Sequence, residues 1–305
     1  MNISIKYRLL QHQSKLDFLD IDLDNDNLLF IDPRLIEISS DKYSKEMQKN
    51  IEAFWGELIK FVKSKDIKNV YKILSGMKEP QETKLGYATS KNSGNSISNK
   101  IKPKLVNAIQ NNKAVQSGIL SHFGDVELFI EDISSDRISD ITTKIIKRVL
   151  IDYTIDQCNK HGIPLVKFNQ DDIFNPLTKK WEKGTFELPS HEGKAIIFVP
   201  KHIVRLENSA NKNMSSFYRF AIRHFIVHDK DMIEDISPSG KDGQLLLRDV
   251  KSKYPLSKDS MSNWMLKYGK MLIDYKTDIL NARIKSLTDD EISEIVYKNL
   301  LSKAS

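Results

Sequence analysis

The feature that most constrains the fold is a long helical pattern that follows a short apolar strand and a group of carboxylates. Apolar side chains recur at helical spacing from about residue 137 to residue 160, and Gly162 stands where a helix-terminating glycine is expected. The preceding segment, residues 126–131, alternates between the two faces of an extended chain and predicts a strand. A chain with this segment at its centre is expected to combine helices and strands in one core.

The composition is typical of a globular protein with a substantial core. The 305 residues suffice for one large domain or two modest ones, and 40% of them are hydrophobic while 29% are charged. A mean hydropathy of -0.42 and the lack of any apolar run near the length of a membrane helix predict no membrane span. The single cysteine, Cys158, excludes an internal disulfide and is typical of a reducing cytoplasm, where we expect the protein to be located.

Strands are predicted mainly before residue 205 and helices mainly after residue 212. The predicted strands are residues 2–10, 16–23, 28–31, 126–131, 163–167 and 195–199. The predicted helices are residues 39–65, 67–76, 103–112, 137–160, 217–226, 245–252, 258–285 and 288–301. The expected fold class is therefore α+β, with a mixed-sheet body over residues 1–210 and a helical C-terminal subdomain over residues 211–305.

Four aspartates alternate along the second predicted strand and the turn after it, at positions 20, 22, 24 and 26. Their spacing resembles the start of a calcium-binding loop, in which carboxylates occupy alternate positions. Asn25 stands where such a loop requires glycine, and Ile31 stands where it requires a bidentate glutamate. We therefore interpret the four aspartates as the polar face of an edge strand.

An acidic group interrupts an otherwise basic chain between the central predicted strand and the long helix. Residues 121–160 carry eight Asp and Glu against five Lys and Arg, whereas residues 41–120 carry seven against fifteen and the whole chain has a net charge of +6. A basic surface attracts the phosphates of a polyanion, and clustered carboxylates bind a divalent cation. Glu131, Asp136 and Asp140 are therefore candidate Mg²⁺ ligands. The alternative is an ordinary solvated helix start, because acidic residues favour helix N-termini.

This arrangement is compatible with a PD-(D/E)xK-like nuclease core. That chemistry needs carboxylates at the end of a sheet to hold Mg²⁺, and a lysine beside the attacking water. The match is partial, because Val199 stands two positions before the candidate lysine, where the motif has an acid. Asp136 can equally cap the helix, and Asp140 can pair with Lys144 four residues later. The candidate catalytic residues are Asp136, Asp140, Glu187 and Lys201.

Basic residues in and near the glycine- and serine-rich segment 86–100 are candidates for contacts with a nucleic-acid backbone. The segment lacks the spacing of a P-loop or of a dinucleotide-binding motif, and its alternative role is a flexible connector. Two arginines beyond it can clamp phosphate bidentately, or they can make structural ion pairs. We favour DNA over RNA as the partner. The candidate phosphate-binding residues are Lys91, Lys100, Lys102, Lys104, Arg137 and Arg205.

Three stretches, LFIEDISSDRISDITTKIIKRVLIDYTIDQC, ELP and IIFVPKHIVR, carry a resemblance to known sequences. They resemble a family of uncharacterised bacterial proteins associated with mobile antiviral-defence gene clusters, over about residues 85–205. That family has Gly-Pro-Asp before its Arg-x-Ser-Asp motif, whereas this chain has Ser134, Ser135 and Asp136 at those positions. The resemblance implies a bacterial defence context, and it brings no established activity.

Two functions from different classes are compatible with these observations. The first is a metal-dependent nuclease that serves as an effector subunit of a bacterial antiviral defence system. The second is a non-catalytic subunit of a multi-component defence complex that binds nucleic acid or protein. The C-terminal helices predict a protein partner or self-association, because their apolar residues exceed a single helix stripe. These residues are Trp264, Met265, Tyr268, Met271, Leu272 and Tyr275.

Overall fold

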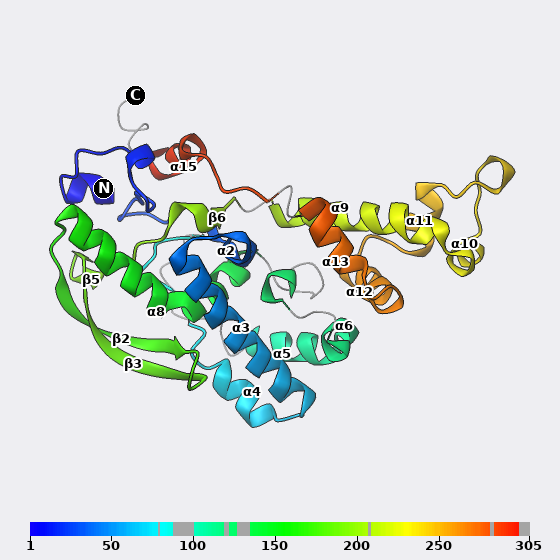
Figure 1. The fold of residues 1–305 in the computed structure, drawn as a ribbon, viewed down its shortest axis with the longest axis horizontal. Helices are drawn as coiled ribbons and strands as arrows, with labels where there is room; N and C mark the ends of the chain where they lie inside the picture. Colours follow the sequence, from blue (N-terminus) through cyan, green and yellow to red (C-terminus); the bar gives the residue numbers. More distant parts are fainter. Residues whose placement is uncertain are drawn as a thin grey trace. The chain divides into compact units, whose positions relative to one another are not determined.

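The fold was analysed in a computed structural model, whose elements are labelled in Figure 1. The structure describes residues 1–78, 80–87, 101–118, 122–126, 135–206, 209–280 and 284–298. Helices predominate over these residues, the sheets are small and antiparallel, and the fold class is α+β as the sequence predicted. No helix in the described parts of the chain is both long and apolar enough to cross a bilayer.

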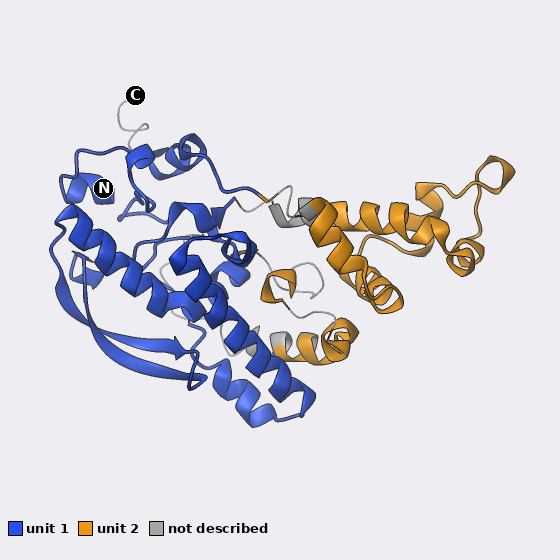
Figure 2. Cartoon of the chain, viewed as in Figure 1, with its two compact units in different colours: residues 1–104, 134–207, 285–305 blue, residues 105–133, 208–284 orange. Residues whose placement is uncertain are grey.

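Two compact units make up the chain, and neither is continuous in sequence (Figure 2). Unit 1 comprises residues 1–104, 134–207 and 285–305, and unit 2 comprises residues 105–133 and 208–284. The sequence predicted two continuous parts that meet at residues 210 and 211. The observed units interleave, because the chain leaves unit 1 twice and returns to it twice.

Unit 1 is built around two long helices, α3 (Lys42–Lys63) and α8 (Ser135–His161), which pack against each other. Asp41 starts α3 by accepting hydrogen bonds from the backbone N–H groups of Tyr43 and Ser44, at 2.9 and 3.1 Å. Gly162 ends α8 in the left-handed region, at φ +66°. Both helices confirm the sequence prediction. The shorter helices of unit 1 are α1 (Ile3–Lys6), η1 (Gln13–Lys15), α2 (Pro33–Ile38), α4 (Ile67–Ile73), η3 (Lys201–Ile203) and α15 (Asp289–Val296).

The described strands form three antiparallel pairs, all in unit 1. β1 pairs with β6, β2 with β3, and β4 with β5. The first of these pairs is held to α8, because the backbone N–H of Ile31 donates to the hydroxyl of Ser139 at 2.9 Å. The strands are β1 (Phe30–Ile31), β2 (Val166–Asn175), β3 (Lys180–Leu188), β4 (Ser190–His191), β5 (Lys194–Ala195) and β6 (Val204–Arg205).

The hairpin of β2 and β3 packs along α8 (Figure 1). The sequence predicts a short strand at residues 163–167 followed by an irregular excursion, and the structure corrects this to a strand ending at Asn175 and a second strand paired with it. Phe174 and Trp181 face each other across the hairpin, and both rings contact Phe54 of α3. Trp181, which the sequence placed in the irregular excursion, therefore packs with the buried Phe54 and Phe174.

The N-terminal segments are less regular than the sequence predicts. Residues 2–10 contain the short helix α1 instead of a strand, and residues 16–23 make only isolated bridges. Asp20 and Asp22 are buried, so their interpretation as the exposed face of an edge strand is wrong. Asp20 instead accepts hydrogen bonds from the backbone N–H and the hydroxyl of Ser4, at 2.7 and 2.5 Å. Side-chain hydrogen bonds to α1 therefore replace a strand ladder here.

Two further predicted strands are shorter or lie partly beyond the described residues. In residues 195–199 only Ala195 belongs to a strand. The N–H groups of Ile196 and Ile197 donate to the carbonyls of Pro189 and Glu82, each at 2.9 Å, so they bond to two different segments and not to one partner strand. In residues 126–131 only Val126 is described, with helical backbone angles, and the other five lie outside the described residues.

Unit 2 is helical in its described residues, and most of the large apolar residues described there are buried, whereas Leu247, Leu256 and Ile273 are exposed. Tyr218 stacks on Trp264 with ring centroids 5.2 Å apart, and Phe217 meets Tyr275 edge to face. Of the six apolar residues from which a protein partner or self-association was predicted, only Tyr268 is not buried, so five of them pack within the chain. The helices are α5 (Ile101–Asn111, which begins in unit 1), α6 (Lys113–Ser117), η2 (Phe123–Asp125), α9 (Ser209–His224), η4 (Ile226–His228), α10 (Lys230–Ile236), η5 (Lys241–Gly243), α11 (Leu247–Lys253), α12 (Lys258–Lys267), α13 (Met271–Tyr275) and the π-helix η6 (Lys276–Leu280).

A substitution at Gly76 would measure how tightly Trp181 of the hairpin is packed. A Cβ atom at this position would lie 2.2 Å from Cδ2 of Trp181, whose indole N–H is held by the carbonyl of Ile73 at 2.7 Å. We expect Gly76→Ala to lower the free energy of unfolding by about 1–3 kcal/mol, because the ring cannot move aside without losing that hydrogen bond. Gly56→Ala, with open space around the new atom in α3, should raise it by about 0.5–1 kcal/mol. Urea denaturation of both variants measures the difference, and wild-type stability in Gly76→Ala would contradict the packing.

Candidate functional site on α8

One face of α8 carries two carboxylates and two lysines in close succession. At 100° per residue, Asp136, Asp140, Lys144 and Lys147 fall within about 80° of the helix circumference. We call this set the charged face of α8. Asp136 and Asp140 are half-buried, whereas Lys144 and Lys147 are only 4% and 3% exposed. Buried lysines are rare without a partner, so the surroundings of this face need a physical account.

The segment Glu82–Gly86 runs along the charged face and explains part of its burial. At one end, Lys147 Nζ lies 2.6 Å from Oε1 of Glu82. At the other end, Gly86 approaches Asp136 so closely that a Cβ atom on the glycine would lie 2.9 Å from Oδ1. Gly86 also has φ +97°, a conformation that favours glycine. The segment thus crosses from the lysine end to the carboxylate end of the face.

Lys144 lies between these two ends, and it has no hydrogen bond or ion pair with any described residue. Burial, together with the nearby charge of Lys147, lowers the pKa of Lys144 below its ordinary value. Glu82 and Asp172 act in the opposite direction. Asp172 is already engaged, since its carboxylate lies 2.6 Å from Nζ of Lys78. Lys144 is therefore a buried amine among charges that are paired with other groups.

Two neighbouring elements hold those charges in place. Asp172 lies at a register shift of β2 with φ +53°, and such bulges redirect side chains out of the regular strand pattern. Burial alone would raise the pKa of Glu82, but Lys147 and Lys144 outweigh that effect and the pKa lies below its ordinary value. Glu82 is therefore ionised at neutral pH and compensates the lysines.

The structure does not bring every predicted catalytic residue to this face. Glu187 is exposed on β3, opposite Lys167 at the start of β2, which follows the C-terminal end of α8. A 27-residue helix is about 40 Å long, so Glu187 lies far from Asp136 at the other end. Lys201 Nζ is bound to Asp289 at 2.7 Å, and its backbone N–H donates to Asp17. Asp17 in turn pairs with Lys160 near the C-terminal end of α8, which places Lys201 away from the carboxylates too.

The predicted phosphate-binding residues have mixed outcomes. Arg205 is buried on β6 and forms an ion pair with Asp32 at 3.4 Å, the structural alternative that its sequence context allowed. Arg137 is half-buried on the first turn of α8. Lys91 and Lys100 lie outside the described residues, as does the predicted metal ligand Glu131. Lys102 and Lys104 belong to α5, but the structure does not describe their side chains.

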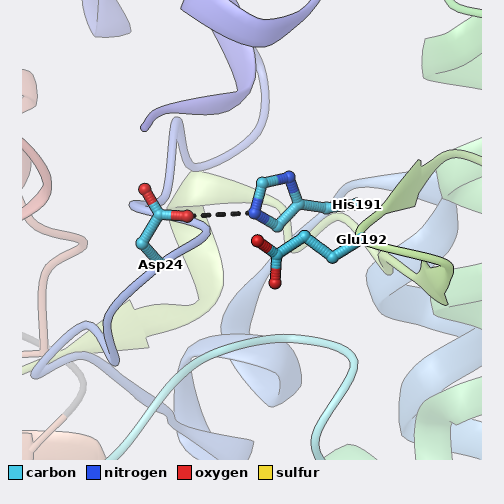
Figure 3. A group of neighbouring side chains, drawn as sticks. All are labelled: Asp24, His191 and Glu192. Carbon is cyan, nitrogen blue, oxygen red and sulfur yellow. Dashed lines mark hydrogen bonds and ion pairs between the residues drawn. The ribbon is translucent and has the colours of Figure 1, made fainter.

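Within the described residues, Asp136 and Asp140 belong to no group of three metal-ligating side chains. A group of that kind is present elsewhere in unit 1, formed by Asp24, His191 and Glu192 (Figure 3). Sequence reasoning did not single out His191 or Glu192. It also treated Lys144 only as a partner of Asp140, although the spacing of Asp136, Asp140 and Lys144 already placed them on one helix face.

A family model described as a domain of unknown function (DUF8370) matches residues 8–211. The chain belongs to the DUF8370 family. The match includes the charged face of α8, the segment Glu82–Gly86 and the β2–β3 hairpin, so the candidate site lies inside the DUF8370 region. Neither the curated proteins nor the solved structures contain a match to this DUF8370 chain.

Proposed function

We propose that this DUF8370 protein is a Mg²⁺-dependent nuclease whose centre is the charged face of α8. One observation carries the proposal: two half-buried carboxylates, Asp136 and Asp140, are followed one helical turn later by Lys144, a buried amine without a described partner. A carboxylate pair beside a lysine is the combination that metal-assisted phosphodiester hydrolysis requires. Lys144 takes the role of catalytic lysine that the sequence suggested for Lys201, and Glu187 has no role in this centre.

Each of these residues has a defined part in the proposed reaction. Asp136 and Asp140 would hold Mg²⁺, which prefers oxygen ligands and keeps several waters when few carboxylates bind it. The cation, when bound, supplies charge to the phosphate and lowers the pKa of a water. Lys144 would accept a proton from the attacking water or offset charge on the phosphate, and a pKa below its ordinary value favours the neutral amine that the first role needs.

The net charge of +6 supports a polyanionic substrate, for which we favour DNA over RNA. The resemblance to bacterial proteins of antiviral-defence clusters extends the proposal to an effector subunit that acts on foreign nucleic acid. A non-catalytic nucleic-acid-binding subunit is the second candidate. It is favoured by the absence of a third ligand for Asp136 and Asp140 among the described residues.

The test of the proposed function is cleavage by the purified full-length protein. Supercoiled plasmid, linear duplex and single-stranded RNA are incubated with the protein and Mg²⁺, Mn²⁺ or EDTA. Cleavage with a divalent ion and none with EDTA supports the nuclease. Retardation of the same substrates in a gel without cleavage under any condition favours the binding subunit instead.

Lys144→Met separates the role of the lysine from its effect on folding. We expect cleavage to fall by about a hundredfold or more, because a positioned acid–base group typically contributes 10² to 10⁴. The free energy of unfolding should stay level or rise, because a buried amine is replaced by an apolar side chain of similar length. Lys160→Met is the matched control: it lies on the same helix, and its exposed ion pair with Asp17 contributes little to stability. Wild-type cleavage by Lys144→Met would remove this residue from the mechanism.

A further inference from the structure

A mixed set of nitrogen and oxygen donors lies in another part of unit 1. Asp24 belongs to the loop before β1, His191 is the last residue of β4, and Glu192 begins the turn between β4 and β5. One donor atom from each residue lies within 4.8 Å of the other two, and Nε2 of His191 is 3.0 Å from Oδ1 of Asp24. Figure 3 shows both carboxylates beside this edge of the imidazole ring.

The β4–β5 hairpin, which carries His191 and Glu192, has a well-defined backbone conformation. Glu192 and Gly193 connect the strands with φ +49° and +75°, the positive angles of a tight hairpin turn. The hairpin is anchored at Ser190, whose carbonyl accepts from the hydroxyl of Tyr7 at 2.9 Å and whose N–H donates to the same oxygen at 3.0 Å. His191 and Glu192 are therefore held on a fixed element, which limits the entropy that an ion would have to remove.

We infer that Asp24, His191 and Glu192 form a Zn²⁺ site. Zn²⁺ binds histidine nitrogen and carboxylate oxygen at about 2.0–2.2 Å, whereas Mg²⁺ and Ca²⁺ select oxygen donors. Donors of a tetrahedral ion are roughly 3.4 Å apart at those bond lengths, so a small rotation of the exposed Glu192 side chain completes the set. Three protein ligands leave one coordination position open to water or to a further ligand.

Charge supports a cation at this position. The Glu192 carboxylate has no hydrogen-bond or ion-pair partner among the described residues, and it lies beside the same ring edge as the carboxylate of Asp24. The other oxygen of Asp24 is held by the α-amino group of Met1 at 2.6 Å, which leaves Oδ1 directed toward His191. An ion between the three donors would offset the repulsion between the two carboxylates.

The ammonium group of Lys6 disfavours a bound ion, because it lies next to the imidazole ring of His191. Nζ of Lys6 lies 3.3 Å from Nδ1 of His191. A neutral imidazole that binds a metal through Nε2 carries its proton on Nδ1, and this proton needs an acceptor. An ammonium has only donors, so Lys6 must move away when the ion binds. Lys6→Gln supplies an amide oxygen that accepts from Nδ1 and should therefore favour the ion.

The experiment measures Zn²⁺ binding to the metal-free full-length protein by isothermal titration calorimetry, without nucleic acid. We expect one Zn²⁺ per chain, at least tenfold weaker binding in His191→Ala and in Glu192→Gln, and several-fold tighter binding in Lys6→Gln. Mg²⁺ should not compete. His228→Ala, which removes an exposed histidine of unit 2, is the control and should bind as wild type.

Two outcomes would overturn the inference. Wild-type protein that takes up no Zn²⁺ at micromolar concentration has no such site, and equal binding by wild type and Glu192→Gln places the ion elsewhere. Glu192 lies on an exposed turn, so its amide variant keeps the fold and remains informative if His191→Ala does not fold. The site shares no residue with the charged face of α8, and its failure leaves the nuclease proposal unchanged.

Discussion

Asp140→Asn is expected to abolish Mg²⁺-dependent cleavage of nucleic acid while the protein stays folded. The amide cannot supply the negative charge that a divalent ion requires, and losing a metal-held transition state should cost a hundredfold or more, of order 3 kcal/mol. Without metal, the variant should melt slightly higher than wild type, because one of two neighbouring like charges is gone. Cleavage assays and melting curves with and without Mg²⁺ measure both effects.

Matched variants distinguish metal binding from stabilisation of the helix N-terminus. Asp152→Asn removes a carboxylate from the same helix, where it pairs with Arg148 on the surface, and should retain full cleavage. Asp136 lies in the first turn of α8, so if it only favours the positive end of the helix dipole, Asp136→Asn should cost less than about 1 kcal/mol and keep full cleavage. Mg²⁺ should raise the melting temperature of wild type and not that of Asp140→Asn, because the rise reflects binding to the native state. Full cleavage by Asp136→Asn and by Asp140→Asn would end the nuclease hypothesis for this face.

Glu82→Gln is expected to destabilise unit 1 by about 3–5 kcal/mol. The substitution leaves Lys147, which is 3% exposed, without its carboxylate partner, and it removes the negative charge nearest to Lys144. Urea denaturation at neutral pH measures the loss. The double variant Glu82→Gln with Lys147→Met should recover most of it, because replacing both members of a buried pair is far less costly than removing one.

The same pair predicts a pH dependence. The pKa of Glu82 in the folded protein lies below its ordinary value, so the folded state binds this proton more weakly than the unfolded chain. The stabilisation is therefore fully present above the pKa of the unfolded chain and is lost as the pH falls through the folded-state pKa. The difference in unfolding free energy between wild type and Glu82→Gln should shrink under these acidic conditions. A difference that is constant with pH would show that the effect of Gln comes from packing and not from charge.

Local sequence predicted the elements whose determinants lie within a few residues. The apolar repeat of α3, with Asp41 in the capping position, and that of α8, with Gly162 after its last turn, are sufficient to define both helices. The hairpin of β2 and β3 was missed, because its second strand carries polar and charged residues at its exposed positions. What makes it a strand is the packing of Phe174 and Trp181 on α3, a contact with residues more than a hundred positions away.

The candidate site likewise has features that local sequence predicts and features that depend on distant contacts. The spacing of Asp136, Asp140 and Lys144 is enough to place them on one face of a helix, because a helix repeats every 3.6 residues whatever surrounds it. The burial of Lys144 and its lack of a described partner became evident only in the folded protein, as did the pairing of Glu82 with Lys147 and the distant positions of Glu187 and Lys201. Burial and charge compensation depend on which distant segments meet, and no local pattern carries that information. His191 reaches Asp24 for the same reason, across a separation of 167 positions that only the folded chain can close.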